Sequence, residues 1–204
     1  MRIAQVAPLA EAVPPRLYGG TERVVSWLTE ELVRKGHQVM LFGSGDSKTA
    51  AELAPCVPQG LRLAGIRDTT AHLLVMLDQV RQRANEFDLI HFHVDLLQFQ
   101  IFRRIAHKCL TTLHGRLDLA DYHPVYRSFP EMPLISISDS QRTPIRDANW
   151  VGTVYHGLPS NLIRFSPGPG DYLAFMGRIS PEKRPDRAIE IAGHELGHEC
   201  KPRA

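Results

Sequence analysis

The sequence alternates short apolar runs with longer stretches in which apolar residues recur every three or four positions. This alternation is typical of β–α–β units, which build a parallel sheet covered by helices. Apolar runs predict strands at 2–7, 37–42, 89–93, 109–113, 134–137 and 152–155, and helical periodicity predicts helices at 21–35 and 71–85. The expected fold class is therefore α/β, with a Rossmann-like parallel sheet in the first part of the chain.

The segment 21–35 has the clearest helical pattern in the chain. Its expected apolar stripe consists of Val24, Val25, Leu28 and Leu32. Thr21 is a good N-cap residue for this helix. Gly36 lies where a glycine commonly ends a helix. The sequence thus predicts both ends of the first helix.

The second part of the chain is expected to be incomplete. A stretch rich in proline and glycine at 157–170 is typical of an interdomain linker, and a strand at 171–176 and a helix at 185–192 follow it. One strand and one helix cannot bury a core of their own. We therefore expect a complete N-terminal Rossmann-like domain at 1–157. Residues 158–204 would then hold the linker and the truncated start of a second Rossmann-like domain.

Charge and cysteine content restrict the partners and the compartment. The net charge is +2 and no basic stretch is interleaved with aromatic residues, so nucleic acid is not an expected partner. No apolar run approaches the roughly 18 residues of an integral membrane segment, and the N-terminal run is too short for a secretory signal. Cys56, Cys109 and Cys200 are widely spaced. They fit reduced thiols in the cytoplasm better than a disulfide framework.

Two short segments could bind a diphosphate. Gly19 and Gly20 precede the first predicted helix, where free backbone N–H groups favour an anion. A tight turn would use the same glycines, and the G-x-G-x-x-G spacing of dinucleotide sites is missing. Arg178 and Lys183 lie just ahead of the last predicted helix and could neutralise a diphosphate leaving group. A solvated basic loop would have the same sequence.

Four pieces of sequence, taken in order, resemble family 4 of the glycosyltransferases, which have the GT-B fold of two facing Rossmann-like domains. These pieces are GGTERV at 19–24 with RKGHQV at 34–39, DLIHFH at 88–93, TTLHG at 111–115 and FMGRISPEKR at 175–184. The resemblance covers about residues 1 to 192. It implies a retaining transfer of a sugar from a nucleotide diphosphate sugar donor to a carbohydrate or small-molecule acceptor.

The resemblance also implies roles for individual residues. The donor diphosphate would be bound by Gly19, Gly20, Arg178 and Lys183, and His114 would lie at the active-site edge near the transferred sugar. His91, His93, His156 and Gly157 would line the cleft. Family members typically require no bound metal and no other cofactor. The first domain would mainly bind the acceptor.

One family motif, a glutamate pair spaced as E-x7-E, belongs to a later region of the second domain. Glu182 and Glu190 have this spacing, and so do Glu22 and Glu30. Both pairs lie in the wrong structural context, and we interpret them as coincidences. Because that later region is missing, we expect the transferase activity to be impaired by truncation. The alternative is a catalytically inactive fragment that acts only as a ligand-binding module.

Two histidine patterns could instead bind zinc. His91, His93 and Asp95 would lie on one face of an extended strand, although the end of such a strand also lines the cleft in GT-B proteins. His194-Glu195-Leu196-Gly197-His198 matches the H-E-x-x-H pattern of zinc peptidases. Gly197 weakens a helix there, and no third ligand follows. We expect no metal at either place.

Overall fold

The computed structural model describes residues 1–168, 170, 172–177 and 179–196. The chain divides into two compact units, Met1–Ser160 and Asn161–Ala204. The strands, all in the first unit, are β1 (Arg2–Val6), β2 (Gln38–Ser44), β3 (Glu52–Val57), β4 (Leu89–Phe92), β5 (Cys109–Thr112), β6 (Leu134–Ser136) and β7 (Trp150–Thr153).

The α-helices are α1 (Gly20–Arg34), α2 (Thr70–Gln82), α3 (Gln98–Phe102), α4 (His123–Ser128) and α5 (Pro185–Leu196). Short 3-10 helices connect them: η1 (Ala84–Glu86), η2 (Arg103–Lys108), η3 (Ala120–Tyr122), η4 (Ser140–Ile145) and η5 (Pro181–Lys183).

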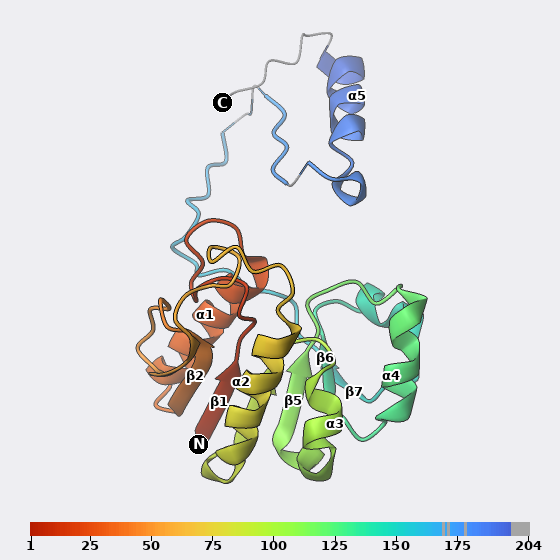
Figure 1. Ribbon diagram of the computed structural model, residues 1–204. Coiled ribbons are helices and arrows are strands. Elements are labelled where there is room, and N and C mark those ends of the chain that lie inside the picture. Colours follow the sequence, from red (N-terminus) through yellow and green to blue (C-terminus); the bar gives the residue numbers. More distant parts are fainter. Residues whose placement is uncertain (169, 171, 178, 197–204) are drawn as a thin grey trace. The chain divides into compact units, whose positions relative to one another are not determined.

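Within the described residues the strands form one seven-stranded sheet in the order β3-β2-β1-β4-β5-β6-β7, and every neighbouring pair is parallel (Figure 1). This arrangement confirms the predicted α/β class and the parallel sheet. The order reverses direction at β1, which has β2 on one side and β4 on the other. Such a reversal places a crevice at the carboxyl edge of the sheet.

Strand β3 was not predicted from the sequence. It carries Pro55, and a proline normally argues against a strand because it cannot donate a ladder hydrogen bond. In the structure β3 is the edge strand beside β2, where one side of the strand has no neighbour. An edge position tolerates proline for that reason. β7 begins two residues earlier than predicted.

The two faces of the sheet differ in what they bury. α2 and α3 lie in front of the sheet in Figure 1 and α1 lies behind it. The front face holds the main apolar core, which includes Phe42, Ile90 and Phe92 together with Met76 of α2 and Phe102 of α3. The face towards α1 has a much smaller apolar cluster: Ala7, Val13, Val25 and Leu41. This difference leaves room for polar side chains behind the central strands.

The predicted start of the first helix is wrong and its predicted end is confirmed. The helix begins at Gly20 with Gly19 as the N-cap, so Thr21 lies inside the first turn. At the other end Gly36 has φ +83°, in the left-handed region that favours glycine. The amide of Gly36 donates to the carbonyl of Val33 (2.9 Å), and the amide of His37 donates to that of Leu32 (3.1 Å). This pair of bonds is the Schellman motif.

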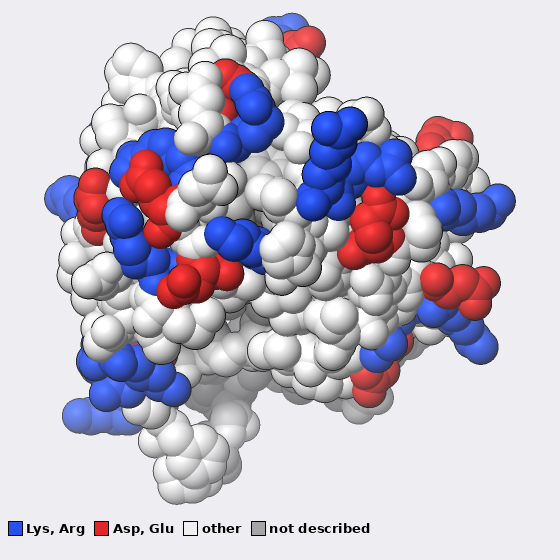
Figure 2. Space-filling model, turned by 90° about the horizontal axis from the view of Figure 1, so that it is seen from below, with Lys and Arg blue, Asp and Glu red and all other residues white. Residues whose placement is uncertain are grey.

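Charges of both signs are scattered over the edge of the sheet opposite the carboxyl edge, where the strands begin and the crossover helices end. Figure 2, seen from below, shows Lys and Arg side chains interspersed with Asp and Glu. Ion pairs within helix ends, such as Arg81 with Asp78 (2.8 Å), contribute to this mixture. Exposed pairs of this kind stabilise a fold by about 1 kcal/mol or less.

The second unit contains η5 and α5, and none of its described residues is in a strand. The predicted strand at 171–176 is therefore wrong for 172–176, and Asp171 lies outside the described residues. An isolated strand leaves its backbone N–H and C=O groups without partners. No described segment of the unit pairs with 172–176. A second Rossmann-like sheet is thus not present in the described part of the chain.

The cysteines bear on the expectation of reduced thiols, and the helices bear on the expectation that the chain has no integral membrane segment. Cys56 and Cys109 are free thiols, and burial raises their pKa values to about 11 and about 12 respectively. Cys200 lies outside the described residues. Among the helices of the described part, none is long and apolar enough to cross a membrane.

Candidate active site

The loops that leave β1, β4 and β5 meet at the carboxyl edge of the sheet. The chain leaves β1 towards α1 on one face and leaves β4 towards α3 on the other, so these loops diverge. A pocket of about 320 Å³, which we call the switch-point pocket, lies between them. It is lined by Pro8, Leu9, Ala10, Thr21, Thr69, Leu73, His93, Val94, Asp95, His114 and Gly115.

A second pocket, of about 530 Å³, lies between α1 and the segment that follows β7. We call it the α1-side pocket. It is lined by Val24, Trp27, Leu28, Glu31, His91, His93, Thr112, His114, Ile135 and residues 154–159. Part of the predicted apolar stripe of the first helix thus borders a pocket instead of the core. His93 and His114 line both pockets.

Four histidines, which we call the histidine row, stack side by side. The ring centroids of His91 and His93 are 4.2 Å apart, those of His93 and His114 5.2 Å, and those of His114 and His156 5.1 Å. Nδ1 of His93 lies 2.9 Å from Nε2 of His114, and Nδ1 of His114 lies 3.2 Å from Nε2 of His156. The row therefore connects β4, the exits of β4 and β5, and the segment after β7.

Two buried side chains on neighbouring strands hold the inner end of the row. Gln5 of β1 is in register with His91, and its Oε1 lies 2.7 Å from Nε2 of His93. The Gln5 amide nitrogen lies 3.5 Å from Nδ1 of His91. Nε2 of His91 lies 2.8 Å from the hydroxyl of Thr112 on β5. The rings of His91 and His93 are thus held by side chains from adjacent strands.

The two-residue period of a strand explains why these side chains meet. Successive residues of a strand point to opposite faces of the sheet. On β4, His91 points towards the α1-side pocket, whereas Phe92 packs in the main core against Phe102 at a centroid distance of 4.8 Å. His93, just after β4, returns to the α1 face. On β5 the same rule places Thr112 towards the row.

Burial makes the row a set of neutral imidazoles. It lowers the pKa of His91 to about 4 and that of His93 well below its ordinary value. Burial, with smaller contributions from the neighbouring His156 and His91, lowers the pKa of His114 to about 3. His156 is exposed, but the part of its ring that is buried lowers its pKa as well. At neutral pH these rings therefore offer directed hydrogen bonds and no positive charge.

The two glycines before α1 differ in their surroundings. A Cβ on Gly20 would meet no atom within 4 Å, so its backbone is open to a ligand. A Cβ on Gly19 would lie 2.7 Å from Cβ of Pro15 and 2.8 Å from Oε2 of Glu22. Close packing therefore requires glycine at position 19. Neither residue lines the two pockets, and their contact with a diphosphate stays a prediction.

Of the two glutamates with the E-x7-E spacing in the first unit, one is buried and the other has hydrogen-bond partners. Glu22 is buried in the first turn of α1, and burial raises its pKa. Glu30 accepts a hydrogen bond from the hydroxyl of Thr49 (2.6 Å) and another from the amide of Ala50 (3.1 Å). These contacts support the interpretation of this spacing as a coincidence.

The remaining predicted site residues lie in different parts of the structure. His156 and Gly157 line the α1-side pocket with His91 and His93. Lys183 is the exposed last residue of η5 in the second unit. Arg178 lies outside the described residues, so the pairing of these two cations stays a prediction.

The zinc alternatives gain no support. Within the described part of the chain, no group of three His, Cys, Asp or Glu side chains has a geometry that could hold a metal ion. His91 and His93 are instead joined through Gln5. Of the H-E-x-x-H pattern, His194 lies in α5, whereas Gly197 and His198 lie outside the described residues.

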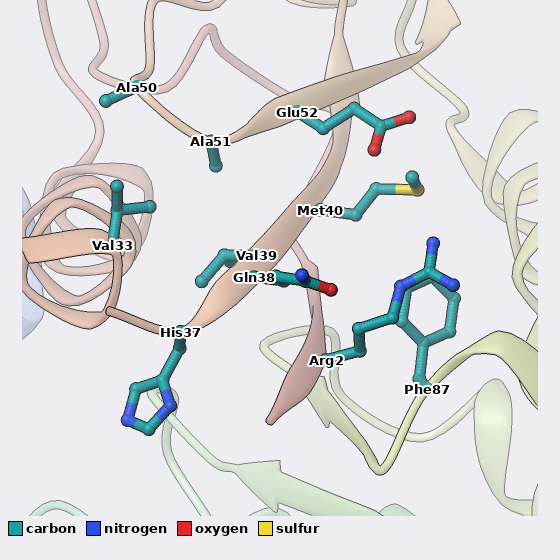
Figure 3. A pocket seen from close by; sticks show the side chains of 10 residues that line it. All are labelled: Arg2, Val33, His37, Gln38, Val39, Met40, Ala50, Ala51, Glu52 and Phe87. Carbon is teal, nitrogen blue, oxygen red and sulfur yellow. The ribbon is translucent and has the colours of Figure 1, made fainter. Parts of the chain in front are cut away.

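A further pocket of about 320 Å³ lies at the opposite edge of the sheet (Figure 3). Arg2, Gln38 and Glu52, the first residues of β1, β2 and β3, border it. The guanidinium of Arg2 is 3.3 Å from the carboxylate of Glu86 and lies over the ring of Phe87. In open α/β sheets, ligands bind at the carboxyl ends of the strands and seldom at the amino-terminal ends. This pocket therefore does not compete with the histidine row as a site.

Sequence reasoning missed Gln5 and Thr112. Neither residue has a motif of its own, because each matters only through its place beside His91 in the sheet. One signal was available: a glutamine and two adjacent threonines within the predicted strands imply buried polar groups that need partners. Trp27 and Leu28 were assigned to a helix, but their place in a pocket could not be read from periodicity.

Comparison with known sequences identifies one family. The sequence profile of Glycosyltransferase Family 4 matches residues 18–140, which is more than half of the chain. The matched segment includes α1, the whole of β4 and β5, and His114. No curated protein matches the sequence significantly.

Two solved structures resemble the fold. AviGT4, a glycosyltransferase involved in avilamycin A biosynthesis, matches with a TM-score of 0.61 and 19% identity. The match covers 97% of this chain but only 54% of AviGT4. Sucrose-phosphate synthase from Thermosynechococcus elongatus matches with a TM-score of 0.49 and 16% identity, over 75% of this chain and 46% of the synthase. The chain thus spans about half the length of these proteins.

Proposed function

The chain belongs to glycosyltransferase family 4, and we propose that it takes part in the retaining transfer of a sugar from a nucleotide diphosphate sugar to a carbohydrate or small-molecule acceptor. The observation that carries this proposal is the position of His114. It lies at the carboxyl edge of the sheet, beside the topological switch point, and borders both pockets. Open α/β sheets bind their ligands at this edge.

The acceptor binds in the first unit. The described residues that line the switch-point pocket include two threonines and two neutral histidines but no lysine or arginine. Such a lining suits a neutral molecule rich in hydroxyl groups better than a diphosphate. Asp95 adds a carboxylate that can accept hydrogen bonds from hydroxyl groups.

The donor diphosphate is bound by backbone and cations. The open backbone at Gly20 presents N–H groups at the start of a 15-residue helix, where the helix dipole favours an anion. Arg178 and Lys183 supply the positive charge that stabilises the departing nucleoside diphosphate. Charge stabilisation of this kind can replace a metal ion when the donors are preorganised.

We expect neutral saccharides to bind to the ligand-free chain in the switch-point pocket. In amide NMR spectra titrated with a panel of oligosaccharides, the signals of residues 93–95 and 113–115 should shift. The change His114→Ala should weaken binding roughly tenfold, because one hydrogen bond contributes about 1 kcal/mol or slightly more. His107→Ala is the matched control, since His107 is exposed and outside the row. Equal affinity of the His114→Ala variant would contradict this placement.

We expect the 204-residue chain to turn over nucleotide sugars poorly. Positioning of two reactants can lower a barrier by roughly 7–11 kcal/mol, and Lys183 is exposed in a unit whose described residues form no sheet. The measurement is acceptor-dependent release of nucleoside diphosphate across several donors. Fusion of residues 1–160 to a complete second domain of a related transferase should raise the rate.

This fusion also distinguishes the alternative, a module that only binds ligand. Such a module would stay inactive in the fusion while still binding saccharides. Rapid acceptor-dependent turnover by the chain alone would show that it completes a working site, and our expectation of impairment would then be wrong.

A further inference from the structure

We propose that Gln5 is a positioning residue: its side-chain amide fixes which nitrogen of every ring in the histidine row carries the proton. As a result His114 directs a hydrogen-bond acceptor, not a donor, towards His156 and the α1-side pocket. The order of donors and acceptors along a row of neutral rings determines these proton positions. Its consequence for ligand binding rests on the proposed function, whereas the proton positions do not.

The series of hydrogen bonds starts at the side-chain amide oxygen of Gln5, which can only accept a hydrogen bond. It lies 2.7 Å from Nε2 of His93, so this nitrogen carries the proton and donates. In a neutral ring Nδ1 of His93 then has a lone pair. It accepts from Nε2 of His114 at 2.9 Å. His114 is thereby also held with its proton on Nε2.

The same pairing of donors with acceptors sets the proton positions at both ends of the histidine row. Nδ1 of His114 has the lone pair, so Nε2 of His156 donates to it at 3.2 Å. In the other direction, the amide nitrogen of Gln5 can only donate, and it faces Nδ1 of His91 at 3.5 Å. His91 then carries its proton on Nε2 and donates to the hydroxyl of Thr112 at 2.8 Å. All four rings therefore share one tautomer.

Because each ring is neutral, the proton position in one ring determines the proton position in the next. A doubly protonated ring would donate from both nitrogens, and its neighbours would then no longer be determined. Burial keeps the pKa values of His91, His93 and His114 far below 7, so such a ring is rare at neutral pH. A row of neutral rings has only two consistent arrangements, and the orientation of one buried amide selects between them.

The selected arrangement has a consequence for ligand recognition. His156 is exposed and belongs to the segment after β7, and its bond to His114 is the longer of the two ring-to-ring bonds of the row. A ligand hydroxyl that takes the place of His156 meets the lone pair of His114 Nδ1 and donates to it. With the opposite tautomer the same position would require a ligand acceptor. Gln5 therefore determines the kind of polar group that the pocket prefers.

The test is nitrogen-15 NMR of the imidazole rings in the ligand-free chain at neutral pH, where protonated and lone-pair nitrogens have distinct chemical shifts. We expect a protonated Nε2 and a lone-pair Nδ1 in His91, His93, His114 and His156. In Gln5→Met, which keeps the length of the side chain but removes its hydrogen bonds, His93 and His114 should lose this single-tautomer pattern and show both forms.

Thr112→Val is the matched control, because it removes the partner of His91 but leaves the link from Gln5 to His93 intact. The signals of His93 and His114 should stay as in the wild-type chain. A protonated Nδ1 at His93 or His114 in the wild-type chain would overturn the proposal even if Gln5→Met failed to fold. An unchanged pattern in a folded Gln5→Met variant would also overturn it. Neither result depends on glycosyl transfer, so the proposed function is tested separately.

Discussion

Lowering the pH from 7 to 5 is expected to reduce the free energy of unfolding by roughly 4 kcal/mol or more. The cause is the row of buried, neutral histidines. In the unfolded chain a histidine has a pKa of about 6.5. In the folded protein burial lowers the pKa of His91 to about 4, that of His114 to about 3 and that of His93 well below 6.5.

The sign of the effect follows from proton binding. Above pH 6.5 both states are neutral at these rings, and their full contribution to stability is present. As the pH falls below 6.5 the unfolded chain binds protons that the folded protein excludes, so stability falls until the folded pKa values are reached. His91 and His114 each account for about 2 kcal/mol at pH 5, and His93 adds to the loss in the same direction. Burial raises the pKa of Glu22, so this carboxyl acts in the opposite direction.

The loss is comparable with the whole stability of a typical domain, about 5–15 kcal/mol, so acid unfolding should begin near pH 5. Urea unfolding at a series of pH values and constant ionic strength measures it. His93→Gln should make the dependence on pH less steep, whereas His107→Gln, at an exposed position, should leave it unchanged. A change below 1 kcal/mol between pH 7 and 5 would show that the rings are not buried and neutral.

Phe92→Ala is expected to destabilise the protein by about 4 kcal/mol, as large core aromatic residues generally do when truncated to alanine. The side chain is 0% exposed and packs edge-to-face against Phe102 in the main core. Its removal leaves a cavity between the sheet and α3. Because Phe92 and the histidine row lie on opposite faces of β4, the imidazole signals of the folded variant should stay in place.

Phe165→Ala removes the same atoms from a side chain that is 85% exposed, and it serves as the chemical control. Its effect should lie within about 0.5 kcal/mol of zero. The measurement is urea unfolding at pH 7.5, where the histidines are neutral in both states. A loss under 2 kcal/mol for Phe92→Ala would mean that the main core closes around the missing ring.

Much of the fold could be predicted because the pattern of apolar and polar residues in a short stretch of sequence indicates whether that stretch is a strand or a helix. The central strands are short apolar runs whose position is visible in the sequence, and the periodicity of α1 fixed that helix to within one residue. The edge strand β3 escaped prediction, since the tolerance of Pro55 depends on the absence of a neighbour on one side. No strand forms at 172–176, within the strand expected at 171–176, for the related reason that a strand requires a partner.

The candidate site divides in the same way. The sequence by itself determined the α/β class, the family and the histidines at the strand exits, because those properties reside in runs of adjacent residues. Only the tertiary structure decided that His91, His93, His114 and His156 form one hydrogen-bonded row. Their contacts depend on strand register and on which face of the sheet each residue occupies. Gln5 meets His93 across 88 positions of sequence, and no local pattern can specify such a contact.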